Sequence, residues 1–245
     1  YSVLMGACYG ISFKNFIITG VPRNDLLLKS SGRENLKEIL NIDSKNKIIF
    51  YMPTYRKSSY GEINGCEEGY IFSEKDINKL DEYLQKNNIT MFAKMHPFEE
   101  QNFEKYFKEK NFKNIILFKE EFLNLNNIDL YEILNSCDYL LTDYSSVYFD
   151  YLLLDKPMLF FNKDIEEYEK STGFLLEPYD YWTPGPKCKT IKSIINQLEE
   201  INSGRDEYKK KRNELKNIFH KYKDSKSCER IKEMILKLIE SSGRE

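Results

Sequence analysis

The sequence has almost no excess charge of either sign. Its 37 lysines and arginines face 39 aspartates and glutamates, which leaves a formal net charge of −2 at pH 7. Domains that bind nucleic acid usually carry a strong positive field, so this balance excludes nucleic acid as a main partner. The chain also contains no apolar run long enough to span a membrane and no visible signal peptide.

Cysteine is scarce and scattered. The five cysteines make an odd total, lie far apart and include no Cys-x-x-Cys pair. This pattern argues against a disulfide framework and against a zinc site, and it favours reduced thiols in a cytoplasmic protein. No cluster of carboxylates predicts another metal site, so we expect neither a metal nor a cofactor. The cysteines are Cys8, Cys66, Cys137, Cys188 and Cys228.

Apolar runs and amphipathic stretches alternate through most of the chain. This alternation predicts βαβ units, and therefore an α/β fold with a parallel sheet and helices on both faces. The expected strands are 47–52, 89–95, 114–118, 139–141 and 157–161. The expected helices among them are 73–87, capped by Ser73, 99–110, 129–137, capped by Asp129, and 147–154.

The two ends of the chain have a different character. Residues 190–202, 206–222 and 225–240 show helical patterns rich in lysine and glutamate, which predict a helical carboxy-terminal segment. Residues 1–31 resemble the tail of a preceding domain and a linker, and residues 32–245 the domain itself. Because the chain begins with Tyr1 and not with methionine, we expect it to be the carboxy-terminal half of a longer protein.

Residues 142–150 are the most informative segment. They follow the apolar run 139–141 and open the helix expected at 147–154. The start of a helix presents unpaired backbone N–H groups and the positive end of the helix dipole. A strand that passes into a helix through hydroxyl groups therefore predicts a phosphate-binding loop.

Three hydroxyls in this loop can donate to a phosphate, those of Thr142, Ser145 and Ser146. The alternative is purely structural, because Asp143 or Ser145 can simply cap the helix. Asp150 shares a helix face with Ser146, where it can orient a ligand hydroxyl, fix the serine or only complement the helix dipole.

Two further strand ends carry candidate residues. Arg56 follows the first strand and His96 follows the second. Because ligands bind beyond the carboxyl ends of parallel strands, both should meet the phosphate loop in one crevice. Strand alternation places Lys94 and His96 on one face, and Pro97 keeps His96 out of a helix. Tyr55 is a candidate to stack on a base.

Each of these residues has a structural alternative. His96 is either a hydrogen-bonded structural group or a donor to a pyrophosphate and its leaving group. Arg56 either presents its planar guanidinium to a phosphate or lies on a flexible surface. Arg23 and Asp25 either close an interdomain hinge or are ordinary surface charges. His220, expected inside a polar helix, has the weaker case for catalysis.

The ordered set of motifs resembles the CDP-glycerol glycerophosphotransferases, the bacterial teichoic acid and capsule polymerases. Residues 142–150 resemble the family's Thr-Asp-Tyr-Ser-Ser-Val-x-Phe-Asp segment, and five other segments agree in the expected order. They are Thr19-Gly20-Val21-Pro22-Arg23-Asn24-Asp25, Tyr51-Met52-Pro53-Thr54-Tyr55-Arg56, Lys94-Met95-His96-Pro97, Pro184-Gly185-Pro186 and Phe219-His220-Lys221-Tyr222-Lys223-Asp224.

The resemblance implies a Rossmann-like domain, the carboxy-terminal half of a GT-B-type fold. It also implies a transferase that takes CDP-glycerol or a related CDP-polyol, passes glycerol phosphate to a growing polymer and releases CMP. The polymer acceptor would be anchored at the inner face of the plasma membrane, with the protein peripheral to it. The implied catalytic residues are His96 and Asp150, and the implied substrate-binding residues are Arg23, Thr54, Arg56, Lys94, Thr142, Asp143, Ser145 and Ser146.

Two departures from the family pattern qualify these expectations. The family carries a Trp-His-Gly segment, whose histidine is thought to act as the base, in an amino-terminal domain, and this chain has no such segment. Where the family usually has Asp-Gly, the chain has Asp224 followed by Ser225. Two other functions stay open on the residues alone: a nucleotide-sugar glycosyltransferase or epimerase with Glu177 at the ribose, and a non-catalytic flavodoxin-like binding module.

Overall fold

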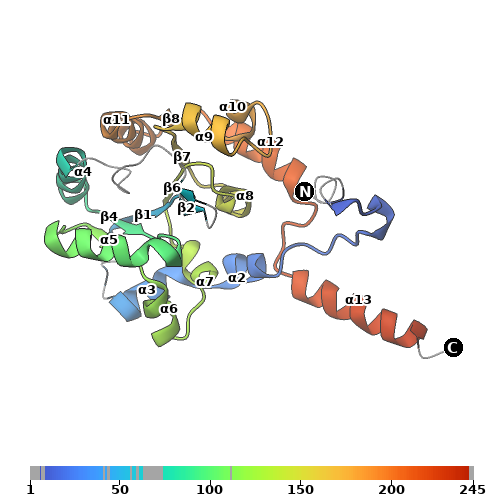
Figure 1. Cartoon of the computed structure of the whole chain (residues 1–245). Helices are drawn as coiled ribbons and strands as arrows, with labels where there is room; N and C mark the ends of the chain where they lie inside the picture. The colour runs from blue at the N-terminus through green and yellow to red at the C-terminus, as the bar shows by residue number, and fades with distance from the viewer. Residues whose placement is uncertain are drawn as a thin grey trace.

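Six parallel strands form the centre of the structure (Figure 1). This computed structural model describes residues 6, 9–40, 42, 45–55, 57–58, 61–62, 74–110 and 112–242. The strands lie in the order β5-β4-β1-β6-β7-β8, and β2 pairs with β3 in a separate antiparallel ribbon. Their bounds are β1 (Lys47–Met52), β2 (Lys57–Ser58), β3 (Gly61–Glu62), β4 (Ile89–Ala93), β5 (Ile115–Leu117), β6 (Tyr139–Thr142), β7 (Met158–Phe161) and β8 (Lys187–Cys188).

The strands are apolar on both sides because helices cover both faces of the sheet. Ile49 and Tyr51 of β1 point into one core with apolar residues of α4, α5 and α11, whereas Ile48 and Phe50 point into the other. The expected α/β architecture is therefore confirmed. The helices are α2 (Arg23–Lys29), α3 (Gly32–Leu40), α4 (Glu74–Lys86), α5 (Pro97–Lys110), α6 (Glu120–Leu125), α7 (Leu130–Leu134), α8 (Val147–Tyr151), α9 (Ile165–Ser171), α10 (Tyr179–Trp182), α11 (Ile191–Asn202), α12 (Lys209–Phe219) and α13 (Ser227–Ser242).

The sequence located most elements to within a few residues. The expected cap Asp129 is confirmed, since it accepts a hydrogen bond from the backbone N–H of Tyr131 at 2.7 Å within a capping box. The helix expected at 206–222 is shorter, because α12 ends at Phe219. The predicted cap Ser73 lies outside the described residues. Within the described ranges no helix is long and apolar enough to cross a membrane.

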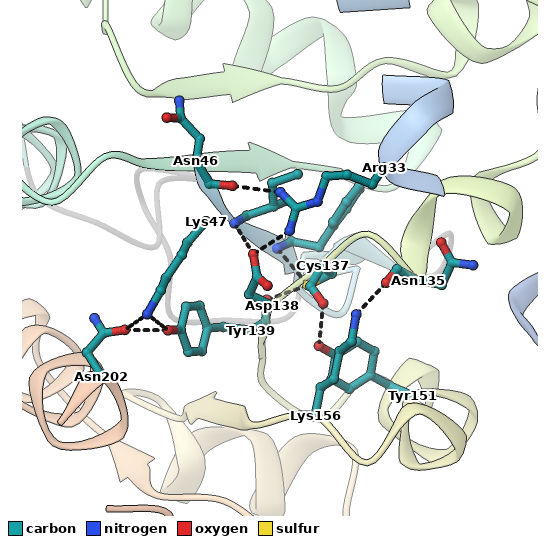
Figure 2. Close-up of polar contacts among 12 residues, drawn as sticks. Arg33, Asn46, Lys47, Asn135, Cys137, Asp138, Tyr139, Tyr151, Lys156 and Asn202 are labelled. Carbon is teal, nitrogen blue, oxygen red and sulfur yellow. Dashed lines mark hydrogen bonds and ion pairs between the residues drawn. The ribbon is translucent and has the colours of Figure 1, made fainter. Parts of the chain in front are cut away.

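Polar side chains fasten β1 to β6 at their amino ends (Figure 2). The carboxylate of Asp138 accepts hydrogen bonds from the backbone N–H of Ile48 at 2.7 Å and from Arg33 at 2.8 Å. Lys47 donates to the hydroxyl of Tyr139 at 3.0 Å. These contacts fix the register of the two central strands, which brings their carboxyl ends level, with Met52 opposite Thr142.

Helix α2 fastens the start of α13, the helix that extends away from the sheet in Figure 1. The buried carboxylate of Asp25 accepts hydrogen bonds from the backbone N–H groups of Ser227 at 2.9 Å and Cys228 at 2.8 Å. Gly20 has a φ of 93° and lies so close to Ser227 that a side chain would not fit there. Of the two alternatives for Asp25, the ordinary surface charge is therefore wrong, because this carboxylate caps α13.

Burial raises the pKa of Asp25, but the hydrogen bonds from Cys228 and Ser227 outweigh burial and hold it below the ordinary value. The stabilisation should therefore be complete above about pH 4 and disappear as the pH falls through the folded pKa. We expect Asp25→Ala to weaken the first turn of α13 by about 1–2 kcal/mol. Amide hydrogen exchange in that turn should accelerate about 5–30-fold.

Glu229→Ala is the matched control for this prediction. Glu229 lies in the same first turn and is exposed, so its loss removes a favourable charge at the helix start but no cap. Equal exchange rates in the two variants would contradict a capping role for Asp25.

Candidate functional site

The central pair of strands, β1 and β6, marks the point where the strand order reverses direction. From β1 the chain passes outward through β4 and β5, and from β6 it passes outward on the other side through β7 and β8. Ligands of open parallel sheets bind in the crevice beyond the carboxyl ends of the strands at this point. The loops that follow β1, β4 and β6 carry the residues that the sequence singled out.

Asp143 joins the loops after β1 and β6. Its side chain is buried, and Oδ1 accepts hydrogen bonds from the backbone N–H of Thr54 at 2.8 Å and from its hydroxyl at 2.7 Å. The same oxygen accepts from the backbone N–H groups of Tyr144 and Ser145. Thr54 and Asp143 thus bind each other, and this contact holds the two loops together.

Thr142 also has a partner inside the protein. Its side chain is fully buried, and its hydroxyl donates to the backbone oxygen of Met52 at 2.7 Å. In contrast, Ser145 is half-buried and Ser146 is exposed, and neither hydroxyl forms a hydrogen bond with another described residue. The two serines therefore remain the hydroxyl donors of this loop that a ligand can reach.

His96 follows β4 and is exposed. Its ring packs against Tyr55 with the centroids 4.7 Å apart and an interplanar angle of 34°. The structure thus brings the segments after β1 and β4 into contact through Tyr55 and His96. Arg56, which follows Tyr55, lies outside the described residues.

Lys94 does not share the surface of His96. Strand β4 ends at Ala93, so the strand alternation that predicted a common face does not continue to His96. The ammonium group of Lys94 is buried and pairs with Glu100 at 2.7 Å and Glu120 at 3.0 Å. It joins the starts of α5 and α6, and its charge is balanced there.

Asp150 bonds with residues of α2 and α7 and forms no hydrogen bond with Ser146. Its buried carboxylate accepts hydrogen bonds from Arg23 Nε at 3.0 Å and from Asn24 at 3.0 Å. A second guanidinium nitrogen of Arg23 lies 2.7 Å away and the hydroxyl of Tyr131 2.8 Å away. Burial and the charge of Asp150 raise the pKa of Tyr131, so this hydroxyl remains a donor. The carboxylate therefore ties α8 to α2 and α7.

The sequence had pointed to Asn24 only as part of a motif, and it gave no signal for Tyr131, whose role requires α7 to lie beside α2. His220 is not inside a helix as predicted, because it follows the last residue of α12. Its Nε2 lies 2.6 Å from the backbone oxygen of Phe149, and burial lowers the pKa of His220. His220 is therefore neutral, and its Nε2–H donates to the backbone oxygen of Phe149 in α8.

A cavity of about 440 Å³ opens on the far side of Ser146. It lies among α8, α9 and α10. Several rings line it, and those of Tyr144 and Tyr168 stack with centroids 3.9 Å apart. The ring-bearing residues are Tyr144, Tyr148, Phe149, Tyr168, Phe174, Tyr179 and Trp182.

A parallel sheet in this strand order, with polar loops where the order reverses, defines a Rossmann-like α/β domain. The family model described as CDP-Glycerol:Poly(glycerophosphate) glycerophosphotransferase matches residues 1–237. The chain belongs to this family of transferases, as its motifs predicted.

Two bacterial relatives illustrate the similarity. The teichoic acid ribitol-phosphate polymerase TarL of Staphylococcus aureus is 30% identical over 230 residues, which are 91% of this chain and 37% of TarL. The teichoic acid poly(glycerol phosphate) polymerase of Bacillus subtilis strain 168 is 33% identical over 195 residues, which are 78% of this chain and 24% of that protein. The chain thus spans less than half of either relative.

Solved structures agree with this assignment. The wall teichoic acid polymerase TagF, as a His-to-Asn variant soaked with CDPG, superposes with a TM-score of 0.74 at 27% identity. The match covers 97% of this chain and 54% of the TagF chain. UDP-GlcNAc 2-epimerase from Neisseria meningitidis, bound to UDP-GlcNAc, superposes with a TM-score of 0.55 at 18% identity. The match covers 94% of this chain and 58% of the epimerase chain, and it supports the fold alone.

Because Asp143 and Thr54 bind each other, substitutions of the two residues should have non-additive effects on the free energy of unfolding. Asp143→Ala leaves up to four donors without their acceptor and should lower the free energy of unfolding by about 2–4 kcal/mol. Thr54→Val removes one of these donors and should cost about 1 kcal/mol. The double variant should be no less stable than Asp143→Ala alone. Urea denaturation of the unsubstituted protein, the two single variants and the double variant would measure their free energies of unfolding. Additive losses would contradict a shared interaction.

Proposed function

We propose that this chain is the donor-binding half of a CDP-polyol-dependent glycerophosphotransferase. In this proposal it binds CDP-glycerol or a closely related CDP-polyol in the crevice between His96 and the loop of Ser145 and Ser146. Family membership supports the reaction class, and the two accessible serine hydroxyls beside the start of α8 support the position of the phosphates.

The proposed reaction moves one phosphoryl group. A hydroxyl oxygen of the acceptor polymer forms a bond to the phosphorus that carries the glycerol, and the bond between that phosphorus and the oxygen of CMP breaks. The acceptor hydroxyl loses its proton to a base, and CMP leaves. Such reactions depend mainly on positioning and on neutralising charge. His96 donates to the pyrophosphate or to the departing nucleotide, and Ser145, Ser146 and backbone N–H groups hold the phosphates.

The other predicted residues divide into two proposed groups. Arg56 remains a proposed phosphate ligand on the basis of its sequence position. The remaining residues have partners inside the protein and are proposed to position the loops and α8. They are Arg23, Thr54, Lys94, Thr142, Asp143 and Asp150.

The rest of the machinery is proposed to lie outside this chain. Residues 1–31 would connect the domain 32–245 to a preceding domain that supplies the base. The acceptor would be a membrane-anchored polymer, which places the proposed site of action at the inner face of the plasma membrane. The isolated chain should therefore bind the donor but turn it over poorly.

Two substitutions separate binding from catalysis. In the full-length enzyme, His96→Ala should lower turnover by about two to four orders of magnitude while the donor affinity changes less than about tenfold. Ser146→Ala should raise the donor dissociation constant about tenfold through one lost phosphate hydrogen bond. Steady-state kinetics and calorimetric titration with CDP-glycerol would measure both effects.

Ser203→Ala serves as the control, because Ser203 is exposed at the end of α11 and away from the crevice. It should match the unsubstituted protein in both assays. Near-normal turnover of a correctly folded His96→Ala variant would make this histidine structural. Failure of the chain to bind CDP-glycerol would overturn the proposed function itself.

A further inference from the structure

The cavity beside Ser146 is lined by a nearly buried tyrosine whose hydroxyl no other described residue uses. Tyr148 is only 5% exposed, and its ring packs against Phe149 and Phe160 at centroid distances of 4.1 and 5.4 Å. The residue lines the cavity, and no described residue forms a hydrogen bond with its hydroxyl. Burial raises the pKa of Tyr148, so the hydroxyl keeps its proton at neutral pH. The hydroxyl itself is open to solvent, so a ligand in the cavity can bond with it in place of water.

Other polar groups around the cavity already form hydrogen bonds within the protein. The hydroxyl of Tyr179 donates to the backbone oxygen of Asp143 at 3.1 Å, and the indole N–H of Trp182 donates to a backbone carbonyl at 3.1 Å. Tyr148 and Ser146 therefore provide hydroxyls that a ligand can use, one deep in the cavity and one at its edge.

The character of the walls restricts the ligand. None of the described residues that line the cavity is charged, and most of them are aromatic or aliphatic. Aromatic faces pack against the C–H faces of neutral rings and chains, whereas an uncharged pocket gives a phosphate no counter-charge. The volume of about 440 Å³ falls in the range of small-molecule sites. A neutral ligand that carries hydroxyl groups satisfies both the walls and the buried tyrosine.

We propose that this cavity binds the terminal, uncharged polyol or sugar unit of the acceptor, with the hydroxyl of Tyr148 bonded to one of its hydroxyls. This inference rests on the proposed function, and it adds the place where the acceptor sits. Ser146 belongs both to the cavity and to the phosphate loop. An acceptor hydroxyl at this edge of the cavity therefore lies beside the phosphorus that it attacks.

The arrangement divides the two substrates between the two sides of α8. The nucleotide occupies the crevice beside Tyr55 and His96, and the acceptor occupies the aromatic cavity. The main competing occupant is the cytosine base of the donor, which is also neutral and also stacks on aromatic rings. The two occupants predict opposite results when each substrate is titrated separately.

Trp182 makes the cavity directly observable, because it is the only tryptophan of the chain and it lines the cavity. The 245-residue chain would be titrated with a synthetic trimer of glycerol phosphate and, separately, with CMP. We expect the trimer to change tryptophan emission saturably. CMP should bind by calorimetry without that change and without displacing the trimer.

Tyr148→Phe should raise the dissociation constant of the trimer about 5–10-fold, since it removes one hydrogen bond, and leave CMP binding unchanged. It should not lower the melting temperature, because the lost hydroxyl has no partner among the described residues. Tyr139→Phe is the matched control, a buried tyrosine at the amino end of β6 that does not line the cavity (Figure 2), and it should leave trimer binding unchanged.

Results of two kinds would overturn the inference. If CMP alters the emission of Trp182 and competes with the trimer, the cavity holds the nucleobase. If neither ligand changes the emission, or if Tyr148→Phe binds the trimer normally, the cavity is not the acceptor site. In both cases calorimetry with CDP-glycerol reports independently on the proposed function, because donor binding beside His96 does not depend on Tyr148.

Discussion

The hydrogen bonds between Asp143 and Thr54 are the constraint on which the candidate site depends. A buried carboxylate is costly unless donors surround it, and here backbone N–H groups and a hydroxyl supply them. Because these donors come from the loops after both central strands, the carboxylate fixes each loop relative to the other. The position of Tyr55 beside His96 follows from one loop, and the direction of Ser145 and Ser146 follows from the other.

Helix α2 extends this constraint beyond the crevice through three consecutive residues. Arg23 and Asn24 bind the carboxylate of Asp150 on α8, and Asp25 caps α13. A seven-residue helix thus connects the helix at the phosphate loop with the helix that leaves the domain. A change in the position of α13 cannot leave α2 undisturbed without breaking buried hydrogen bonds. The amino-terminal motif is therefore explained by its contacts with α8 and α13, whereas the sequence suggested a hinge or surface charges.

The sequence predicted what depends on local pattern. Alternating apolar and amphipathic segments identified the parallel sheet, and the cap at Asp129 followed from the residue types at the start of α7. Prediction from the sequence failed where the position of a side chain depends on which helices and strands pack against each other. Lys94 was placed beside His96 because the strand was expected to continue, and only the end of β4 at Ala93 shows that it turns into the protein.

The aromatic cavity could not be foreseen for the same reason. Its rings come from α8, α9, α10 and the segments between them, and each ring taken alone fits an ordinary core position. What distinguishes the cavity is the empty volume that they leave together, and sequence periodicity carries no information about volume. The unused hydroxyl of Tyr148 has no signal either, because a buried tyrosine is normally expected to find a partner within the fold.

The charges near the carboxyl edge of the sheet show how such a site can work. Lys94 pairs with two glutamates, and Asp150 pairs with Arg23, so these charges balance each other inside the protein. A diphosphate in the crevice would therefore be held largely by backbone N–H groups, serine hydroxyls and His96, which cost little reorganisation during the reaction. In the proposed function, Arg56 or the preceding domain would supply the neutralising cation. A site that gains its full positive charge only when two parts of the enzyme meet would hold the donor in one part and activate it only in the complete enzyme.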